Sequence, residues 1–174
     1  MDEYFWVFAY GSLMWQPGFA YDEAVPAKLH GWHRAMCLLS LHYRGTAEAP
    51  GLVLGLDRGG SCQGIAFRTD ATKGEAVRAY LHEREMITGV YRPRLAPVRL
   101  ADGRRVSAYT FVARRDHPQY AGQLARPQAV ALIRQGVGGK GTCRDYLATT
   151  VAHLDALHLH DENLHGLLRQ VDRA

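Results

Sequence analysis

The chain lacks the features that mark membrane-anchored and exported proteins. Its densest apolar runs, residues 4–10 and 35–41, are far shorter than the roughly 20 residues of a membrane-spanning helix. The N-terminus is acidic where a secretory signal would be basic. Cys37, Cys62 and Cys143 are widely spaced and form no Cys-x-x-Cys pair, which excludes a disulfide framework and a zinc knuckle. We therefore expect a cytoplasmic protein with free thiols and no membrane association.

The chain also lacks a run of basic residues. Its 21 basic and 17 acidic side chains leave a net charge of +4, and the only adjacent basic pairs are Arg104-Arg105 and Arg114-Arg115. A nucleic-acid surface needs clustered cations. We expect no nucleic-acid partner.

What the chain does contain is enough apolar material for one core. With 174 residues, 47% of them hydrophobic, it matches the size of a single domain spanning residues 1–174. The first third has the short apolar and aromatic runs of β-strands. The expected strands are residues 4–10, 27–39 with a break at Gly31, 52–56 and 63–68, and residues 58–60 between the last two resemble a hairpin turn.

From Asp70 the hydrophobic period changes from two to 3.6. Asp70 or Thr72 can cap a helix that continues through Glu85 until Gly89 ends it. The order of strands first, one helix inserted and helices last predicts an α+β fold with a closed or strongly curved sheet and helices outside it. The remaining expected elements are strands 95–100 and 105–113 and helices 127–135, 143–159 and 162–171, with a flexible loop at 136–142.

The most distinctive local feature is the strand that ends at Tyr10 and continues into Gly11-Ser12. A turn of this kind can direct consecutive backbone N–H groups at a carboxylate or an oxyanion. Glycine would let a ligand approach the backbone closely. The alternative is an ordinary tight turn at a strand end.

A second feature is a carboxylate on the apolar side of a helix. Val77, Leu81 and Glu85 are spaced i, i+4 and i+8, so Glu85 continues the stripe that faces the core, whereas Glu75 and Glu83 lie off it. Burial would raise the pKa of Glu85 from about 4.3 toward the range of a general base. The alternative is an exposed carboxylate, or one paired with Arg84, Arg92 or Arg94.

Other candidates are weaker. Residues 136–142 are glycine-rich and contain Lys140, but glycine follows the lysine where a phosphate-binding loop has Ser or Thr. The nine histidines, including His158, His160 and His165, show no metal-ligand spacing. Ser12 lacks a Gly-x-Ser-x-Gly context, and a lone cysteine is more often a small buried hydrophobe than a nucleophile.

Several motifs together resemble the ChaC family of glutathione-specific γ-glutamylcyclotransferases. The resemblance covers nearly the whole chain, and its most specific part is Tyr10-Gly11-Ser12-Leu13 with a downstream Arg84-Glu85 after Tyr80-Leu81. The motifs are Trp6 to Trp15, Tyr43-Arg44-Gly45-Thr46, Gly59 to Gly64, Tyr80-Leu81, Arg84-Glu85-Met86, Tyr120 and Cys143-Arg144-Asp145-Tyr146-Leu147. Two departures are Ala9, where the family often has glycine, and a longer segment at residues 86–91.

The resemblance implies a γ-glutamylcyclotransferase-like fold, a small mixed β-barrel flanked by helices. It implies cleavage of glutathione to 5-oxoproline and cysteinylglycine with no cofactor and no metal, by a monomer or weak dimer. By position, Glu85 would be the catalytic acid and base. The residues that would line the substrate site are Val7, Phe8, Ala9, Tyr10, Gly11, Ser12, Leu13, Arg44 and Tyr120, with Tyr43 and Tyr91 as further candidates for the peptide portion.

Two alternatives to this function stay open. One is a cyclotransferase acting on other γ-glutamyl amines or amino acids. The other is a non-catalytic protein that binds γ-glutamyl compounds or regulates cation transport. An uncompensated carboxylate in an apolar pocket is costly for a protein that only binds, so Glu85 favours an enzyme.

Overall fold

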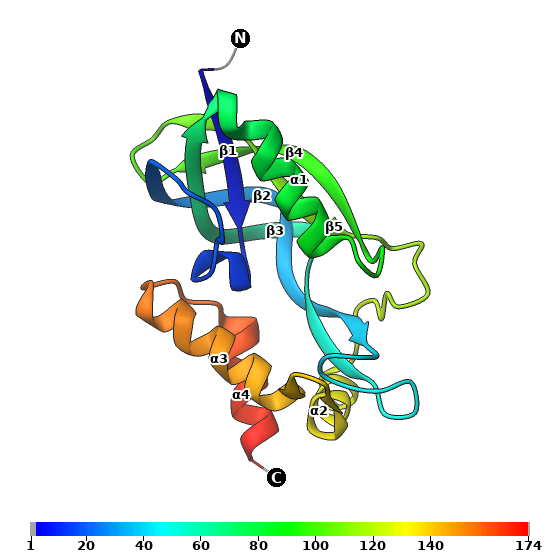
Figure 1. Cartoon of the computed structure of the whole chain (residues 1–174). Coiled ribbons are helices and arrows are strands. Elements are labelled where there is room, and N and C mark those ends of the chain that lie inside the picture. Colours follow the sequence, from blue (N-terminus) through cyan, green and yellow to red (C-terminus); the bar gives the residue numbers. More distant parts are fainter. Residues whose placement is uncertain (1–2, 174) are drawn as a thin grey trace. The chain divides into compact units, whose positions relative to one another are not determined.

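A computed structural model of the chain describes residues 3–173, which form two compact units. The first comprises the N-terminal segment up to Arg34 together with residues 56–114. The second comprises residues 35–55 and the C-terminal segment from Arg115. Strands β2 and β3 each contribute residues to both units (Figure 1).

The sheet is a closed five-stranded barrel with the order β1-β3-β2-β4-β5. Strand β1 pairs antiparallel with β3 on one side and parallel with β5 on the other, and this parallel pair closes the barrel. The predicted α+β class with a mixed barrel is confirmed, and the described part of the chain combines this barrel with four α-helices. The strands are β1 (Tyr4–Ala9), β2 (Glu23–Ser40), β3 (Gly51–Asp70), β4 (Tyr91–Leu100) and β5 (Arg105–Ala113).

The barrel core of the first unit follows from the two-residue period of its strands. Ala96, Val98 and Leu100 alternate with exposed positions along β4, so one face of the strand packs inward. Phe8, Leu29 and Leu56 are almost fully buried in the same apolar cluster. The half-buried side chains of Tyr10 and Trp32 pack against this cluster.

One predicted hairpin turn and one predicted strand break are wrong. Residues 58–60 are not a hairpin turn, because β3 continues through them from Gly51 to Asp70. Gly31 does not break β2 either. Gly31, Gly59 and Gly60 all have positive φ, between 66° and 100°, and glycines of this kind bend a strand without ending it. A small barrel needs such bends, which local sequence cannot distinguish from a turn.

Helix α1 (Gly74–Glu85) occupies the region predicted for it. Asp70 accepts a hydrogen bond from the Thr72 amide and caps a short 3₁₀ helix, Ala71–Lys73, which leads into α1. Gly89 adopts positive φ in the turn after the helix. Figure 1 shows α1 lying alongside the barrel strands of its own unit.

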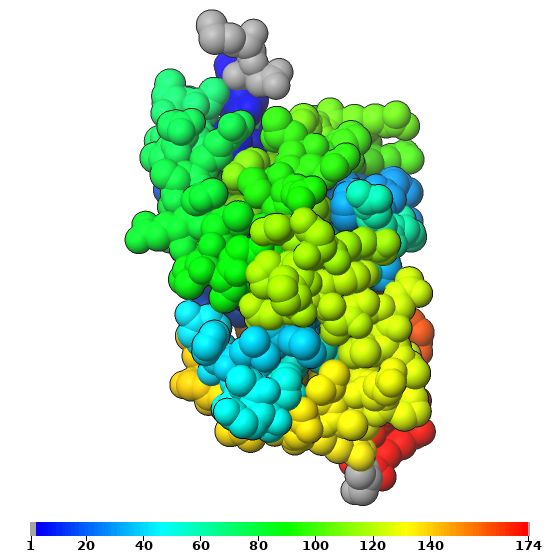
Figure 2. All heavy atoms as spheres, turned by 90° about the vertical axis from the view of Figure 1, so that its right-hand side faces the viewer, coloured from blue at the N-terminus to red at the C-terminus, as the bar shows by residue number. Residues whose placement is uncertain are grey.

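The second unit contains three helices that pack on one another: α2 (Arg126–Gln135), α3 (Cys143–Ala156) and α4 (Glu162–Asp172). The predicted flexible loop at 136–142 is instead a short hairpin of β6 (Val137–Gly138) and β7 (Gly141–Thr142). Figure 2 shows the 41–50 segment beside α2, where Gln135 Nε2 donates to the Pro50 carbonyl oxygen at 2.9 Å.

The predicted free thiols are confirmed: Cys37, Cys62 and Cys143 are all unbridged and buried. Among the described residues, no helix is long and apolar enough to cross a membrane.

A buried arginine holds the end of β1 within the first unit. The side chain of Arg34 is only 4% exposed. Its Nε donates to the Tyr10 carbonyl oxygen and its Nη2 to the Gln63 carbonyl oxygen, both at 2.6 Å. Because a guanidinium carries several donors in a fixed plane, one side chain can satisfy carbonyl groups from β3 and from the residue after β1.

Replacing Arg34 with lysine should destabilise the protein, because one ammonium group cannot span both carbonyl oxygens. We expect Arg34→Lys to lower the free energy of unfolding by about 1.5–3 kcal/mol, the range for a hydrogen bond to a charged group. Urea denaturation measures this loss. Arg99→Lys at an exposed position of β4 is the matched control, with an expected change within about 0.5 kcal/mol. Equal losses in the two variants would contradict this role of Arg34.

Candidate active site

The turn at residues 10–13 lies at the end of β1, where the sequence predicted it. Gly11 precedes a 3₁₀ helix, Ser12–Met14. The Met14 amide donates to the Gly11 carbonyl oxygen at 2.9 Å, and the Gln16 amide donates to the Ser12 carbonyl oxygen at 2.8 Å. The carbonyl oxygens of the turn therefore point back into the chain and hold its shape.

The predicted binding residues of this segment divide into two groups. The side chains of Val7, Phe8 and Ala9 are at most 1% exposed and belong to the core, so these side chains do not line an open site. Leu13 is also buried. The half-buried residues of the segment are Tyr10, Gly11 and Ser12.

Glu85 is the last residue of α1. Val77 and Leu81, the two residues that precede it on the same helical stripe, are 6% and 0% exposed, whereas Glu75 and Glu83 are exposed. The predicted distinction between Glu85 and the other two acids is confirmed. The Glu85 side chain is 22% exposed, so it is largely withdrawn from water but not sealed.

The surroundings of Glu85 disfavour its charged form. Burial raises the pKa of the Glu85 carboxyl above its ordinary value, and the nearby Arg84 guanidinium only partly offsets this. The C-terminal end of a helix also carries partial negative charge, which opposes an anion there. A carboxyl group with a raised pKa is a stronger base when it is ionised than an ordinary carboxylate.

Arg84 brings the two predicted motifs together within the first unit. Its Nη2 donates to Ser12 Oγ at 3.2 Å and its Nη1 to the Gln16 carbonyl oxygen at 2.6 Å. Its Nε lies 3.4 Å from Glu85 Oε1. The turn after β1 and the end of α1, 72 residues apart in sequence, thus meet at one side chain.

Arg44 and Tyr120 belong to the second unit. Arg44 Nη1 donates to the Thr142 carbonyl oxygen at 3.2 Å, and the guanidinium lies over the Tyr146 ring at 5.5 Å. Tyr120 forms an isolated β-bridge with Leu38, and the Arg115 guanidinium lies 5.8 Å from its ring centroid. Both side chains are half-buried and held by their own unit.

The glycine-rich hairpin supports the Arg44 segment and does not form a phosphate loop. The Gly139 amide donates to the His42 carbonyl oxygen at 2.8 Å, and the Lys140 amide donates to the Tyr43 carbonyl oxygen at 2.9 Å. These N–H groups are used within the protein. A phosphate loop needs them to face the ligand.

Cys143 is a structural residue. Its sulfur accepts a hydrogen bond from the Leu52 amide at 3.2 Å and donates to the Leu52 carbonyl oxygen at 3.1 Å. Burial raises the pKa of the Cys143 thiol, which is opposite to what a nucleophilic thiolate needs.

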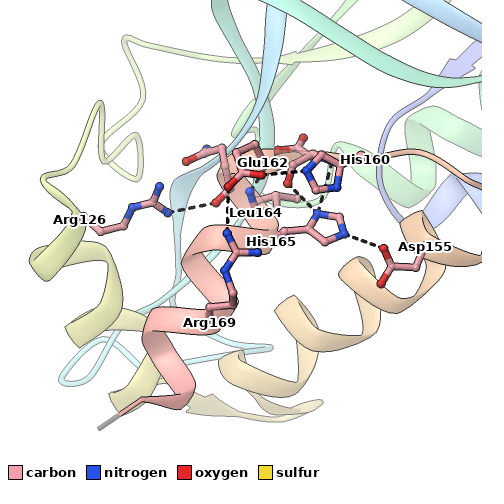
Figure 3. A network of polar contacts seen from close by, with 9 residues as sticks. Arg126, Asp155, His160, Glu162, Leu164, His165 and Arg169 are labelled. Atoms are coloured by element: carbon pink, nitrogen blue, oxygen red, sulfur yellow. Dashed lines mark hydrogen bonds and ion pairs between the residues drawn. The ribbon is translucent and has the colours of Figure 1, made fainter.

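The histidines near the C-terminus form a polar corner between α3 and α4. Figure 3 shows the His165 ring directed at Asp155, with Nε2 2.7 Å from Asp155 Oδ1. Its Nδ1 lies 2.7 Å from the Asp161 carbonyl oxygen. His160 pairs with Glu162 at 2.8 Å. Within residues 3–173, no cluster of His, Cys, Asp or Glu could hold a metal ion, and this corner joins the helices.

The sequence predicted no role for Arg34. For Arg84 it offered only an ion pair with Glu85, which the structure confirms at 3.4 Å. For Arg34 a signal exists, since it shares its strand face with the buried Met36 and Leu38, and an arginine at an inward position needs polar partners. For Arg84 the motif marked the residue, but the Ser12 and Gln16 contacts depend on long-range packing.

Sequence comparison relates the chain to curated enzymes. It is 40% identical over 168 residues to the glutathione-specific γ-glutamylcyclotransferase of Escherichia coli, covering 97% of this chain and 73% of that protein. It is 30% identical over 181 residues to the enzyme of the same name from Schizosaccharomyces pombe, covering 92% of this chain and 87% of that protein.

Structural comparison agrees on the fold. A yeast γ-glutamylcyclotransferase specific to glutathione, in its selenomethionine-labelled crystal form, superimposes with a TM-score of 0.86 at 20% identity, covering 99% of this chain and 97% of that one. The sequence profile of the ChaC-like proteins matches residues 5–174. With the profile spanning nearly its whole length, the chain belongs to the ChaC-like family.

Proposed function

We propose that this protein is a γ-glutamylcyclotransferase that cleaves glutathione into 5-oxoproline and cysteinylglycine. The observation that carries the proposal is Glu85, a largely buried carboxyl group with a raised pKa that Arg84 links to the turn at residues 10–13. The names of the curated relatives give the substrate class.

In the proposed reaction, the α-amine of the γ-glutamyl group attacks the γ-amide carbonyl carbon of the same group. The amine is mostly protonated near pH 7, so it must lose a proton to Glu85 before it attacks. The new C–N bond closes the five-membered ring. As the tetrahedral intermediate collapses, Glu85 returns its proton to the cysteinyl nitrogen, and the original amide bond breaks. The ring nitrogen gives up its remaining extra proton to solvent, which leaves a neutral lactam and the free amine of cysteinylglycine.

Because the nucleophile is part of the substrate, the reaction asks for no nucleophilic side chain. Much of the acceleration comes from holding the γ-glutamyl chain in a folded conformation, since well-oriented intramolecular reactions gain about 7–11 kcal/mol. We assign this task to residues 10–13, whose N–H groups would hold the α-carboxylate or the developing oxyanion. Val7 to Ala9 would contribute through their backbone.

The glycine end of glutathione carries a second carboxylate, for which we propose Arg44 as the partner. An arginine fork matches a carboxylate in geometry and charge. Tyr43, Tyr91 and Tyr120 are proposed donors to the peptide portion. A cytoplasmic location and a monomeric or weakly dimeric state are also part of the proposal, and the buried thiols suit a reducing compartment.

Replacing Glu85 with glutamine should abolish turnover, because the amide keeps the shape of the side chain but cannot accept the proton. We expect the parent protein to release 5-oxoproline and cysteinylglycine from glutathione. Glu85→Gln should lose at least 100-fold in kcat, in line with the contribution of general acid–base catalysis. Both products can be followed by chromatography.

The matched control is Glu83→Gln, an exposed acid on the same helix, which should retain parent activity. Full activity in Glu85→Gln would remove Glu85 as the base. Equal turnover of glutathione and γ-glutamyl-alanine would favour the broader cyclotransferase. Binding of glutathione without turnover of any γ-glutamyl amine would favour the non-catalytic alternative.

Replacing Arg44 with alanine should raise the KM for glutathione about tenfold or more, with a smaller change in kcat, because a charge-assisted contact to the glycine carboxylate is lost. The control substrate is glutathione with its glycine carboxylate amidated, for which parent and variant should have similar KM values. Thermal melting checks that the loss of the Thr142 and Tyr146 contacts leaves the fold intact. An unchanged KM for glutathione would exclude this role.

A further inference from the structure

We infer that Arg84 is a positioning residue of the cyclotransfer reaction, because its guanidinium holds the turn at residues 10–13 and the Glu85 carboxylate in one fixed arrangement. The inference rests on the proposed function. It assigns to Arg84 no contact with the substrate, only control over the two groups that the mechanism requires.

The contacts of Arg84 reach both parts of the proposed site. One terminal nitrogen, Nη2, donates to Ser12 Oγ inside the turn. The other, Nη1, donates to the Gln16 carbonyl oxygen at 2.6 Å and lies 3.4 Å from the Pro17 carbonyl oxygen. Nε lies 3.4 Å from Glu85 Oε1, within ion-pair distance. One half-buried side chain therefore fixes both the loop and the acid.

Tyr80 reinforces this arrangement from one helical turn earlier. Arg84 Nη1 donates to the Tyr80 hydroxyl at 3.1 Å. That hydroxyl occupies the space where a side chain at Gly18 would lie, and Gly18 has a φ of 76°. The Tyr80 ring also meets Phe19 edge-on at 6.5 Å between centroids. The segment at Gly18 and Phe19 therefore packs against α1, the helix that carries Glu85.

Arginine suits this position better than lysine. Its planar fork offers five N–H donors in fixed directions, enough to serve Ser12, Gln16 and Glu85 at the same time. A lysine ammonium would keep the positive charge but is a single compact centre on a flexible stem. Replacing Arg84 with lysine therefore removes the geometry of the contacts but keeps the positive charge.

The positive charge of Arg84 also affects the pH at which Glu85 ionises, and so the fall in kcat/KM on the acid side of the pH profile. The Arg84 charge lowers the pKa of Glu85 against the opposing effect of burial. Residues 10–18 contain no charged side chain, and Tyr10 is their only titratable group. From the end of β5, Arg114 reaches the turn after α1 and donates to the Gly89 carbonyl oxygen at 3.1 Å. Removing the charge of Arg84 should raise the pKa of Glu85.

The test compares Arg84→Gln, Arg84→Lys and the parent protein with glutathione as substrate. Arg84→Gln should lower kcat at least tenfold with a smaller change in KM, and should move the acid limb of kcat/KM to higher pH because Glu85 must be ionised to act as base. Arg84→Lys should also lower kcat but leave the acid limb near its parent position. Arg78→Gln, an exposed arginine of the same helix, should match the parent in both measurements.

A parent-like kcat and pH profile in Arg84→Gln would overturn the inference. A loss of kcat in both Arg84 variants with no shift of the acid limb in Arg84→Gln would reduce Arg84 to a structural residue and would also overturn it. If Arg84→Gln does not fold, the Arg84→Lys variant provides the test. A parent-like kcat in Arg84→Lys would overturn the inference, and a reduced kcat with a normal KM would support it. Absence of turnover in the parent protein would instead reject the proposed function.

Discussion

The architecture depends on the pairing of β1 along both of its edges. Its antiparallel ladder with β3 and its parallel ladder with β5 close the barrel, so this strand cannot slide without breaking two sets of backbone hydrogen bonds. A slip of one residue would also turn Val7 and Phe8 toward the wrong faces. The position of the turn that follows β1 is therefore fixed by the pairing of this strand.

Two arginine side chains hold the segment that follows β1 in place at the candidate site. Arg34, from β2, donates to the Tyr10 carbonyl oxygen, and Arg84, near the end of α1, donates to Ser12 Oγ and the Gln16 carbonyl oxygen. Arg34 supplies donors to carbonyl groups that are withdrawn from water, whereas Arg84 joins a half-buried hydroxyl to an exposed carbonyl group. In both cases the guanidinium group provides several donors on one side chain.

The balance of forces at Glu85 explains why a carboxylate at a helix end can serve as both acid and base. Burial against the Val77 and Leu81 stripe favours the neutral form, whereas the Arg84 guanidinium favours the charged form. Neither effect acts alone. A group held between them can gain and lose a proton during one reaction cycle, which the transfer from the attacking to the departing nitrogen requires.

The sequence by itself determined the elements whose information is local. The strand before Gly11, the helix stripe of Val77, Leu81 and Glu85, and the α+β class all follow from periodicity and turn residues within short windows. The tertiary structure alone decided that Gly59 and Gly60 bend one strand where a hairpin was expected, that residues 136–142 pair as a hairpin, and that Arg84 reaches Ser12. These outcomes depend on barrel closure and on contacts between distant segments, and a bent strand and a turn use the same glycines.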